Sequence, residues 1–210
     1  MIPKVIHICH KTIPSIEKYA LRWKELNPEY ELKLYDDEMC QNFLLTEFSQ
    51  LHLDIFNFIK DGPIKSDFWR VCILYKYGGV YADADIVPLI PLRDYIIPTA
   101  TFVTCISKYN NANNYNPHFI MCEANNPKIN RCIEWYTIYY KRKAYDYWGW
   151  SIIKLFNIIF KYIKHIDSES VQMLVEKTHG DIHDFYCEYK GQTVMKCRHI
   201  DYDPSAHCYK

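Results

Sequence analysis

The chain has 210 residues, with 25 basic and 25 acidic side chains that cancel to a formal net charge of +0. A chain of this length buries enough apolar surface for one core, so we expect a single domain over residues 1–210. The balanced charge lacks the broad electropositive surface that nucleic-acid binding needs, so no nucleic acid is expected as a partner.

The cysteines indicate the chemistry of the compartment. There are nine, an odd number, and no two of them form a C-x-x-C pair. This pattern is typical of neither a zinc site nor a secreted disulfide framework, and it predicts reduced, mostly buried thiols. The opening MIPKVIHIC runs directly into a strand-like pattern without the regions of a signal peptide. We therefore expect a soluble, cytoplasmic protein.

The first part of the chain alternates strands and helices. The pattern predicts a strand at Lys4–Cys9, a loop at Lys11–Ser15 and a helix at Ile16–Leu26. A second strand follows at Glu31–Tyr35, and then a helix that Asp36 N-caps and that runs through Phe48. This order is typical of a mainly parallel sheet with helical crossovers.

A longer helix leads into the most informative stretch. Helical periodicity runs over Ile64–Tyr77, and Gly78-Gly79 ends it because glycine enters the left-handed region without penalty. A brief strand, Val80–Ala82, then ends at Asp83 and Asp85. Ligands usually bind at such a strand end in an open α/β sheet.

The second part of the chain mixes strands and helices. We expect strands at Thr101–Ile106 and Phe119–Cys122, helices at Pro127–Lys141, Trp148–Ile163 and Ser168–Thr178, an exposed SKYNNANNYNP loop, and short strands after Ile182. The most apolar helix, Trp148–Ile163, contains two lysines and is too short to span a bilayer comfortably. A buried or surface-lying helix is favoured there, with peripheral membrane contact as the alternative.

Two aspartates spaced i, i+2 suggest a metal or sugar site. Carboxylate oxygens suit Mg²⁺ and Mn²⁺, which often bridge a protein to the phosphates of a substrate. Considered without its surroundings, however, the pair Asp83 and Asp85 could equally form a solvated turn. Asp67 and Arg70 could likewise be an ordinary surface ion pair on a helix.

The surrounding motifs favour the functional interpretation. The run KSDFWRVCILYKYGGVYADADIVPL resembles the sugar-binding segment of glycosyltransferase family 32, and is similar to the glucosylating domain of large clostridial toxins. That segment couples S/A-D-x-x-R on a helix with a later G-G-x-Y-x-D-x-D. The opening stretch IPKVIHICHK and the later stretch RWKELNPEYELKLYDDE resemble segments of the same family. The likeness covers about residues 1–92 and is thin beyond them.

This resemblance implies a fold and a set of roles. It implies an α/β fold of the GT-A type, a Rossmann-like mixed sheet flanked by helices, in which 1–92 bind a nucleotide sugar and 93–210 face the acceptor. Asp85 would coordinate Mn²⁺ or Mg²⁺ on the diphosphate, and Asp83 would hold ribose or sugar hydroxyls and assist the metal. Asp67 and Arg70 would grip the donor sugar and its leaving phosphate. Tyr81 would line the same pocket.

Two positions depart from the family pattern. His10 stands where the family usually has a tryptophan that stacks on the nucleotide base, and an imidazole stacks more weakly. The family's closing H-x-W segment appears only as AHCYK, in which His207 would complete the metal shell or contact phosphate.

The resemblance therefore predicts a metal-dependent, retaining glycosyltransferase. It would move a sugar from a UDP- or GDP-linked donor to a glycan or other hydroxyl acceptor. No carboxylate identifies itself as a covalent nucleophile, so front-face substitution is expected, with Arg70 stabilising the charge on the leaving phosphate. A haloacid-dehalogenase-type phosphatase, whose D-x-D-x-[TV] motif DADIV also fits, is one alternative. A degenerate nucleotide-sugar or carbohydrate-binding module is another.

Overall fold

The computed structural model describes residues 1–107, 114–162, 170–178 and 185–197. In these residues nine strands form one mixed sheet. The strands are β1 (Val5–Cys9), β2 (Glu31–Tyr35), β3 (Gly79–Ala82), β4 (Val87–Pro88), β5 (Phe102–Ser107), β6 (Asn114–Cys122), β7 (Val171–Thr178), β8 (Phe185–Tyr189) and β9 (Gln192–Lys196). The α-helices are α1 (Glu17–Leu26), α2 (Asp37–Glu47), α3 (Gln50–Phe58), α4 (Gly62–Tyr77), α5 (Pro127–Arg142), α6 (Tyr147–Trp150) and α7 (Ile152–Tyr162).

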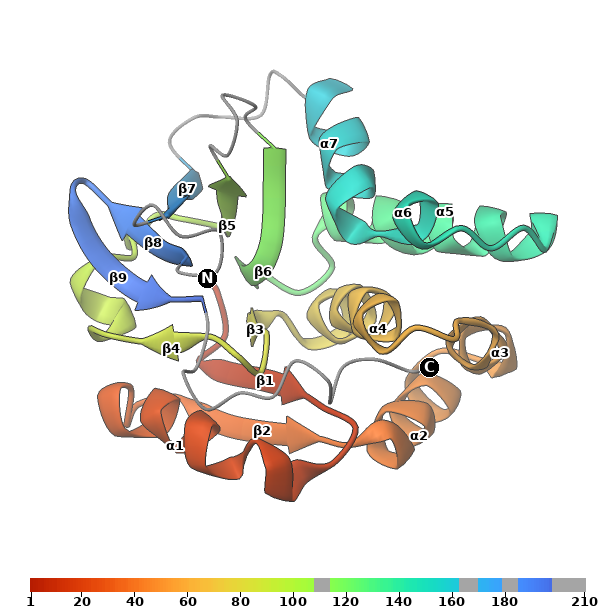
Figure 1. Ribbon diagram of the computed structural model, residues 1–210, viewed down its shortest axis with the longest axis horizontal. Coiled ribbons are helices and arrows are strands. Elements are labelled where there is room, and N and C mark those ends of the chain that lie inside the picture. Colours follow the sequence, from red (N-terminus) through yellow and green to blue (C-terminus); the bar gives the residue numbers. More distant parts are fainter. Residues whose placement is uncertain (108–113, 163–169, 179–184, 198–210) are drawn as a thin grey trace.

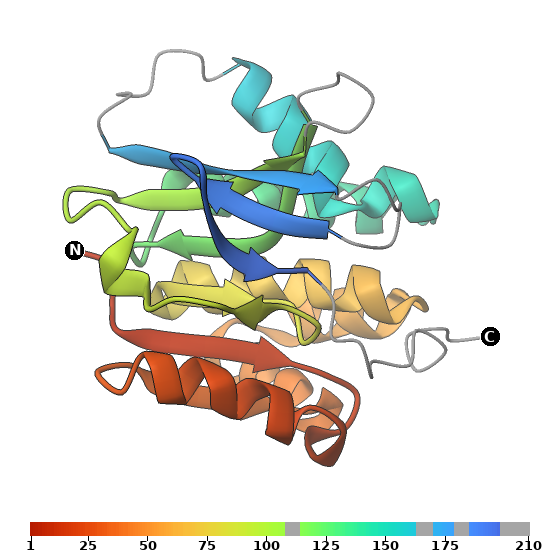
Figure 2. The same cartoon turned by 60° about the vertical axis from the view of Figure 1, so that its left-hand side comes forward.

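The sheet is parallel at one end and mostly antiparallel at the other. Its strand order is β2-β1-β3-β6-β5-β7-β8-β9-β4. β1 pairs in parallel with β2 and β3, and β6 then runs antiparallel to β3. β4 follows β3 closely in the chain, yet it pairs with β9 at the far end of the order. The sheet therefore curls, and the β8–β9 hairpin bends back toward the segment after β3 (Figures 1 and 2).

Helices and the hairpin give the sheet two apolar cores. One core joins α2, α3, α4, α5 and α7 to the face of the sheet that carries Tyr81 and Phe102. The other joins α1 to the opposite face and to the inner side of β8 and β9, around Trp23 and Phe119. The helix that carries Asp67 and Arg70 thus lies on the first face.

Local signals end and start elements where the sequence predicts them. The Asp36 side chain accepts from Met39 N at the start of α2. α4 ends at Tyr77, and Gly78 follows with a φ of 63°. A Cβ on Gly78 would lie 2.6 Å from the backbone nitrogen of Ala124 and 2.9 Å from the carbonyl oxygen of Cys122. Glycine is required there by both conformation and space.

Some sequence predictions of elements were wrong. The segment expected as a helix at Ser168–Thr178 is strand β7 from Val171 onward. The single helix expected over Trp148–Ile163 is two helices, interrupted at Ser151. β6 begins at Asn114, well before the predicted strand, and α3 was not predicted at all.

Burial settles how the most apolar helix is used. The side chains of Leu155 and Phe156 on α7 are fully buried in the first core, which confirms the buried helix. The eight cysteines of the described residues are all buried and unpaired, as the sequence predicts. Among the described residues, no helix has both the length and the apolar character that crossing a membrane requires.

Candidate active site at the end of strand β3

The acidic turn lies at the carboxyl edge of the parallel strands. His7 of β1 pairs with Tyr81 of β3, so residues that follow these strands reach the same edge. Asp83 N donates to His118 O at 2.8 Å, and Ile86 N donates to Asp83 O at 3.0 Å, which closes the turn. The turn is therefore fixed through its backbone.

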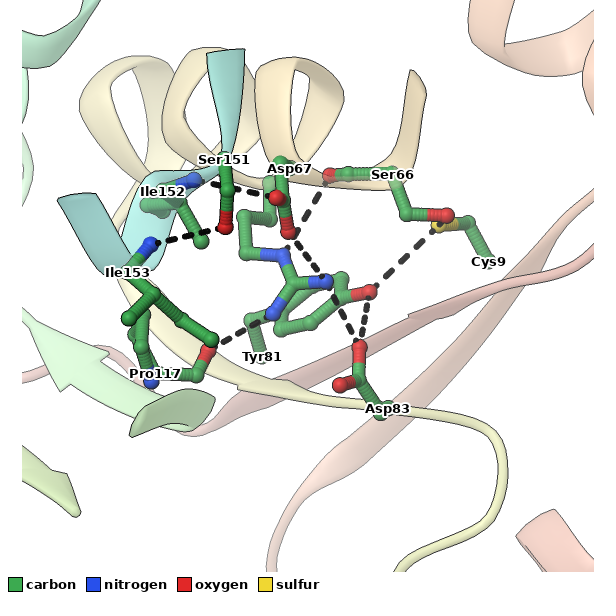
Figure 3. Close-up of polar contacts among 10 residues, drawn as sticks. Cys9, Ser66, Asp67, Tyr81, Asp83, Pro117, Ser151, Ile152 and Ile153 are labelled. Carbon is green, nitrogen blue, oxygen red and sulfur yellow. Dashed lines mark hydrogen bonds and ion pairs between the residues drawn. The ribbon is translucent and has the colours of Figure 1, made fainter. Parts of the chain in front are cut away.

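Arg70 is the centre of the site, and its partners Asp67, Asp83 and Pro117 are labelled in Figure 3. Its Nη2 lies 2.9 Å from Asp67 Oδ1 and 2.8 Å from Asp83 Oδ1. Its Nη1 donates to Pro117 O at 2.7 Å, and its Nε donates to Ser66 O at 3.3 Å. The guanidinium is thus held by α4, β6 and the acidic turn. These contacts exclude the interpretation of Arg70 as a surface ion-pair partner, since its side chain is only 5% exposed.

Tyr81 supports both Arg70 and Asp83. The guanidinium carbon of Arg70 lies 4.4 Å from the centre of the Tyr81 ring, and Tyr81 Oη donates to Asp83 Oδ1 at 2.8 Å. Burial raises the pKa of the Tyr81 phenol well above its ordinary value. The hydroxyl therefore stays protonated and donates to the carboxylate.

Asp67 connects the site to the start of a distant helix. Its Oδ2 accepts from Ile152 N at 3.0 Å, at the first residue of α7, while its Oδ1 faces Arg70. Burial raises the pKa of Asp67 to about 6, against the opposing effects of Arg70 and the Ile152 N–H. This contact explains why the helix expected over Trp148–Ile163 restarts after Ser151, because the carboxylate satisfies an exposed N–H there.

The charges of the site reinforce one another. Burial alone lowers the pKa of the Arg70 guanidinium, but Asp83, Tyr81 and Asp67 outweigh it, and the pKa lies above its ordinary value. Asp83 remains accessible, with 29% of its side chain exposed. One carboxylate oxygen of Asp83 is engaged by Arg70 and Tyr81, and the other points away from this cluster in Figure 3.

Three further residues are expected at the site, namely Asp85, His10 and His207. Asp85 is half-buried in the same turn, two residues after Asp83. His10 is half-buried directly after β1, at the same edge of the sheet, and its Nδ1 accepts from Thr12 N at 3.2 Å. His207 lies outside the described residues.

The donor set of the turn fits a hard divalent cation. The outward oxygen of Asp83 has no partner among the described residues, and the Asp85 carboxylate follows in the same turn. Carboxylate oxygens are ligands that Mg²⁺ and Mn²⁺ take in proteins. The residues present are therefore compatible with the metal that the sequence predicts.

A separate cavity lies over β1, β2 and α2. It has a volume of about 500 Å³ and is lined by residues of β2 and α2, with His7, Tyr35 and Phe43 among them. Its lining includes none of Asp67, Arg70 or Asp83. This cavity is therefore distinct from the cluster around Arg70.

Two backbone groups complete the site without any signal in the sequence. Pro117 O and Ile152 N bind Arg70 and Asp67, although they lie far along the chain from both residues. Backbone groups carry no side-chain signature, and only the pairing of β6 with β3 and the packing of α7 on α4 bring them here.

Comparison with known proteins places the region around the acidic turn among glycosyltransferase sequences. Residues 14–103 match the family described as "Glycosyltransferase sugar-binding region containing DXD motif". An uncharacterized glycosyltransferase of Acanthamoeba polyphaga mimivirus is 32% identical over 46% of this chain and 40% of its own length. The mannosyl phosphorylinositol ceramide synthase of Saccharomyces cerevisiae is 38% identical over 40% of this chain and 23% of its own length. The chain thus spans less than half of either relative.

The fold also resembles that of a solved glycosyltransferase. The structure titled "PaToxG Glycosyltransferase" covers 80% of this chain and 71% of its own, with a TM-score of 0.59 at 18% identity. The predicted GT-A fold, a Rossmann-like mixed sheet flanked by helices, is confirmed by this likeness. Residues 14–103 are therefore similar to the glycosyltransferase sugar-binding regions that carry a DXD motif.

Proposed function

We propose that this chain is a metal-dependent, retaining glycosyltransferase that moves a sugar from a nucleoside-diphosphate sugar to a hydroxyl acceptor. The observation that carries the proposal is the contact of Arg70 with both Asp67 and Asp83, which unites the two halves of the sequence motif at one strand end. The donor would be UDP- or GDP-linked, and the acceptor a glycan or another hydroxyl compound.

The acidic turn would bind the diphosphate end of the donor. Asp85 and the outward oxygen of Asp83 would hold Mn²⁺ or Mg²⁺, and such a cation would neutralise charge on the leaving diphosphate. Arg70 lies 2.8 Å from Asp83, so it would fix the orientation of that carboxylate and add positive charge beside the phosphate. Tyr81 would hold Asp83 from the other side through its hydroxyl.

The geometry supports front-face substitution over a covalent intermediate. Both oxygens of Asp67 are engaged, by Arg70 and by Ile152 N, and the residue is only 7% exposed. The Oδ1 of Asp83 accepts from Tyr81 and Arg70. A carboxylate held in this way is a weak nucleophile. The leaving phosphate would then take the proton of the acceptor hydroxyl on the same face of the sugar.

The same contacts argue against a phosphatase of the haloacid-dehalogenase type. That chemistry needs the first aspartate of the motif, Asp83, as a free nucleophile. Here it forms an ion pair with a buried arginine and accepts from a buried tyrosine. A binding module without turnover stays an outcome of the test below.

We further propose that the chain works as one domain with two roles. Residues 1–92 would bind the nucleotide sugar, with His10 beside the base, and residues 93–210 would face the acceptor. The continuous sheet supports one domain, because β6 of the second part pairs with β3 of the first. His207 is proposed as a further ligand of the metal or the phosphate.

A hydrolysis and transfer screen tests the proposal. Common UDP- and GDP-sugars are incubated with the protein and Mn²⁺, with and without chelator, and released nucleotide is measured. We expect metal-dependent release from one donor, and a fall of at least about two orders of magnitude in Asp85→Asn, because several kcal/mol of charge stabilisation are lost. Asp94→Asn, at a carboxylate 55% exposed outside the motif, is the control and should be unchanged.

Two results would contradict the proposal. Ordinary turnover in Asp85→Asn would remove the assigned role of the acidic turn. Thermal stabilisation by a nucleoside diphosphate and Mn²⁺, without turnover of any donor, would identify the chain as a binding module.

A further inference from the structure

A second cluster of polar side chains lies behind the acidic turn, on the opposite face of the sheet. It consists of Cys105 on β5, His118 on β6, Glu176 on β7, Cys187 on β8 and Cys197 just after β9. These residues are at most 8% exposed. They come from five separate segments, so the curled sheet and not the local sequence gathers them.

The pairing of the strands explains why these side chains meet. Cys197 N donates to Phe185 O across the β8–β9 hairpin, and this places the thiols of Cys187 and Cys197 on one face of it. Glu176 is the direct partner of Cys187 in the neighbouring strand. The curl of the sheet then brings the hairpin against β6, where His118 projects toward it.

The distances within the cluster match those around a tetrahedral metal. Cys187 Sγ lies 3.6 Å from Cys197 Sγ and 3.7 Å from His118 Nε2, which itself lies 3.8 Å from Cys197 Sγ. In a tetrahedral zinc site, bonds of about 2.3 Å to sulfur and 2.0–2.1 Å to nitrogen imply about 3.8 Å between sulfurs and about 3.6 Å between sulfur and nitrogen. The three atoms therefore form one face of such a site.

Cys105 is the candidate for the fourth corner. Its Sγ lies 3.6 Å from Cys187 Sγ, close to the same tetrahedral edge, and it groups with His118 and Cys187 within 4.8 Å. Glu176 Oε2 lies 2.9 Å from His118 Nε2, which is shorter than the edge of about 3.4 Å between nitrogen and oxygen ligands of zinc. Asn116 Nδ2 also donates to this carboxylate oxygen, at 2.8 Å. Because this contact uses the ring nitrogen that would bind zinc, metal binding would replace it, and Asn116 would keep the carboxylate beside the site.

We propose that Cys105, His118, Cys187 and Cys197 bind a structural Zn²⁺ ion. Three thiolates and an imidazole are the soft and borderline ligands that select zinc, and burial leaves no room for a fifth ligand from solvent. The ion joins β5, β6 and the β8–β9 hairpin. The ion also steadies the acidic turn, because the backbone oxygen of its ligand His118 accepts from Asp83 N. This site is independent of the proposed transferase activity.

Metal analysis of the purified chain tests the proposal directly. Protein prepared without added metal is desalted, and its metals are measured by plasma mass spectrometry; we expect about one zinc per chain. Cobalt exchanged for zinc should show thiolate-to-cobalt charge-transfer absorption and the ligand-field bands of a tetrahedral ion. Neither readout depends on transferase activity.

Variants identify the ligands. Cys105→Ser and Cys197→Ser should lose zinc and the cobalt charge-transfer band. Glu176→Gln should keep both. Cys132→Ser, at a fully buried thiol on α5 whose Sγ contacts Lys128 O at 3.5 Å, is the matched control and should also keep both.

Three outcomes would overturn the proposal. Purified protein without zinc that also gives no tetrahedral cobalt spectrum would show that the thiols bind no such metal. A thiol count under denaturation below the nine of the sequence, restored by reductant, would show that a disulfide forms instead. Loss of zinc in Glu176→Gln with retention in Cys105→Ser would refute the assigned ligand set.

Discussion

Replacing Arg70 by methionine tests the central contact of the proposed active site. Methionine keeps much of the aliphatic volume but removes the guanidinium that neutralises Asp67 and Asp83 at 2.9 and 2.8 Å. The carbonyl oxygens of Ser66 and Pro117 lose their donor as well. Breaking a buried ion pair by removing one partner costs about 3–5 kcal/mol, so the free energy of unfolding should fall by that amount at pH 7.5.

The helix α5 offers a matched control. Arg131 and Glu134 also form an i, i+3 ion pair, at 2.7 Å, but their side chains are 66% and 45% exposed. An exposed pair contributes about 0–1 kcal/mol, so Arg131→Met should change stability by no more than that. Both variants are measured by urea unfolding followed by tryptophan fluorescence, since urea does not screen charge as guanidinium does.

The effect of Arg70→Met should also depend on pH. The folded-state pKa of Asp67, about 6, lies above its ordinary 3.8, so its charged form costs stability above the lower value. Loss of Arg70 raises this pKa further, and protonation then relieves the unpaired charge. The deficit should therefore shrink as the pH falls toward about 6 and level off below it, where Asp67 is protonated in both proteins. Losses that agree within about 1 kcal/mol in the two variants at pH 7.5 would refute the reasoning.

Two further predictions concern stability. Gly78→Ala should destabilise the fold by more than Gly191→Ala: both have positive φ, but a Cβ at Gly78 lies 2.6 Å from Ala124 N, whereas at Gly191 nothing lies within 4 Å. Equal midpoints in urea for the two variants would contradict this. Burial lowers the pKa of His7 to about 4, although the hydrogen bond to Gly78 acts in the opposite direction. The unfolded chain therefore binds the proton at higher pH than the folded one, and about 3 kcal/mol of stability is lost as the pH falls from 6.5 to 4. His7→Gln should flatten the pH dependence of unfolding in that window, and parallel curves for wild type and variant would be the opposite result.

The sequence predicts the parts of the site that depend on local spacing. Asp67 and Arg70 lie one turn apart on a helix, and Asp83 follows a strand that two glycines introduce. Each of these positions can therefore be predicted from residues that are close to it in the sequence. The structure adds that Asp67 and Arg70 are buried on a helix whose other sides are buried too. A helical pattern with polar residues on one side predicts an exposed face, and the surface alternative follows from that pattern.

β7 shows why burial patterns can mislead. Its buried face carries Gln172, Leu174 and Glu176, while the apolar Val171 and Met173 on the other face are only half-buried. Gln172 satisfies Ile97 N and Tyr95 O, so its burial needs partners that no local pattern reveals. With apolar residues outside and polar residues inside, the segment does not read as an amphipathic strand.

The cysteine cluster was missed for a related reason. The absence of a C-x-x-C pair excludes only zinc sites built from neighbouring residues. Cys105 and Cys197 lie on separate parts of the chain, and the curl of the sheet brings both within reach of Cys187. Long-range pairing of this kind leaves no trace in spacing.

The position of β3 between β1 and β6 limits how this protein can be divided. The matched family region, residues 14–103, contains β3 but neither Val5–Cys9 nor Asn114–Cys122, the two strands that pair with it. A fragment cut at the limits of that region would leave the backbone of β3 without either partner. The family region is therefore a unit of homology that does not coincide with a unit of folding, and chimeras made from this chain need crossover points outside both neighbouring strands.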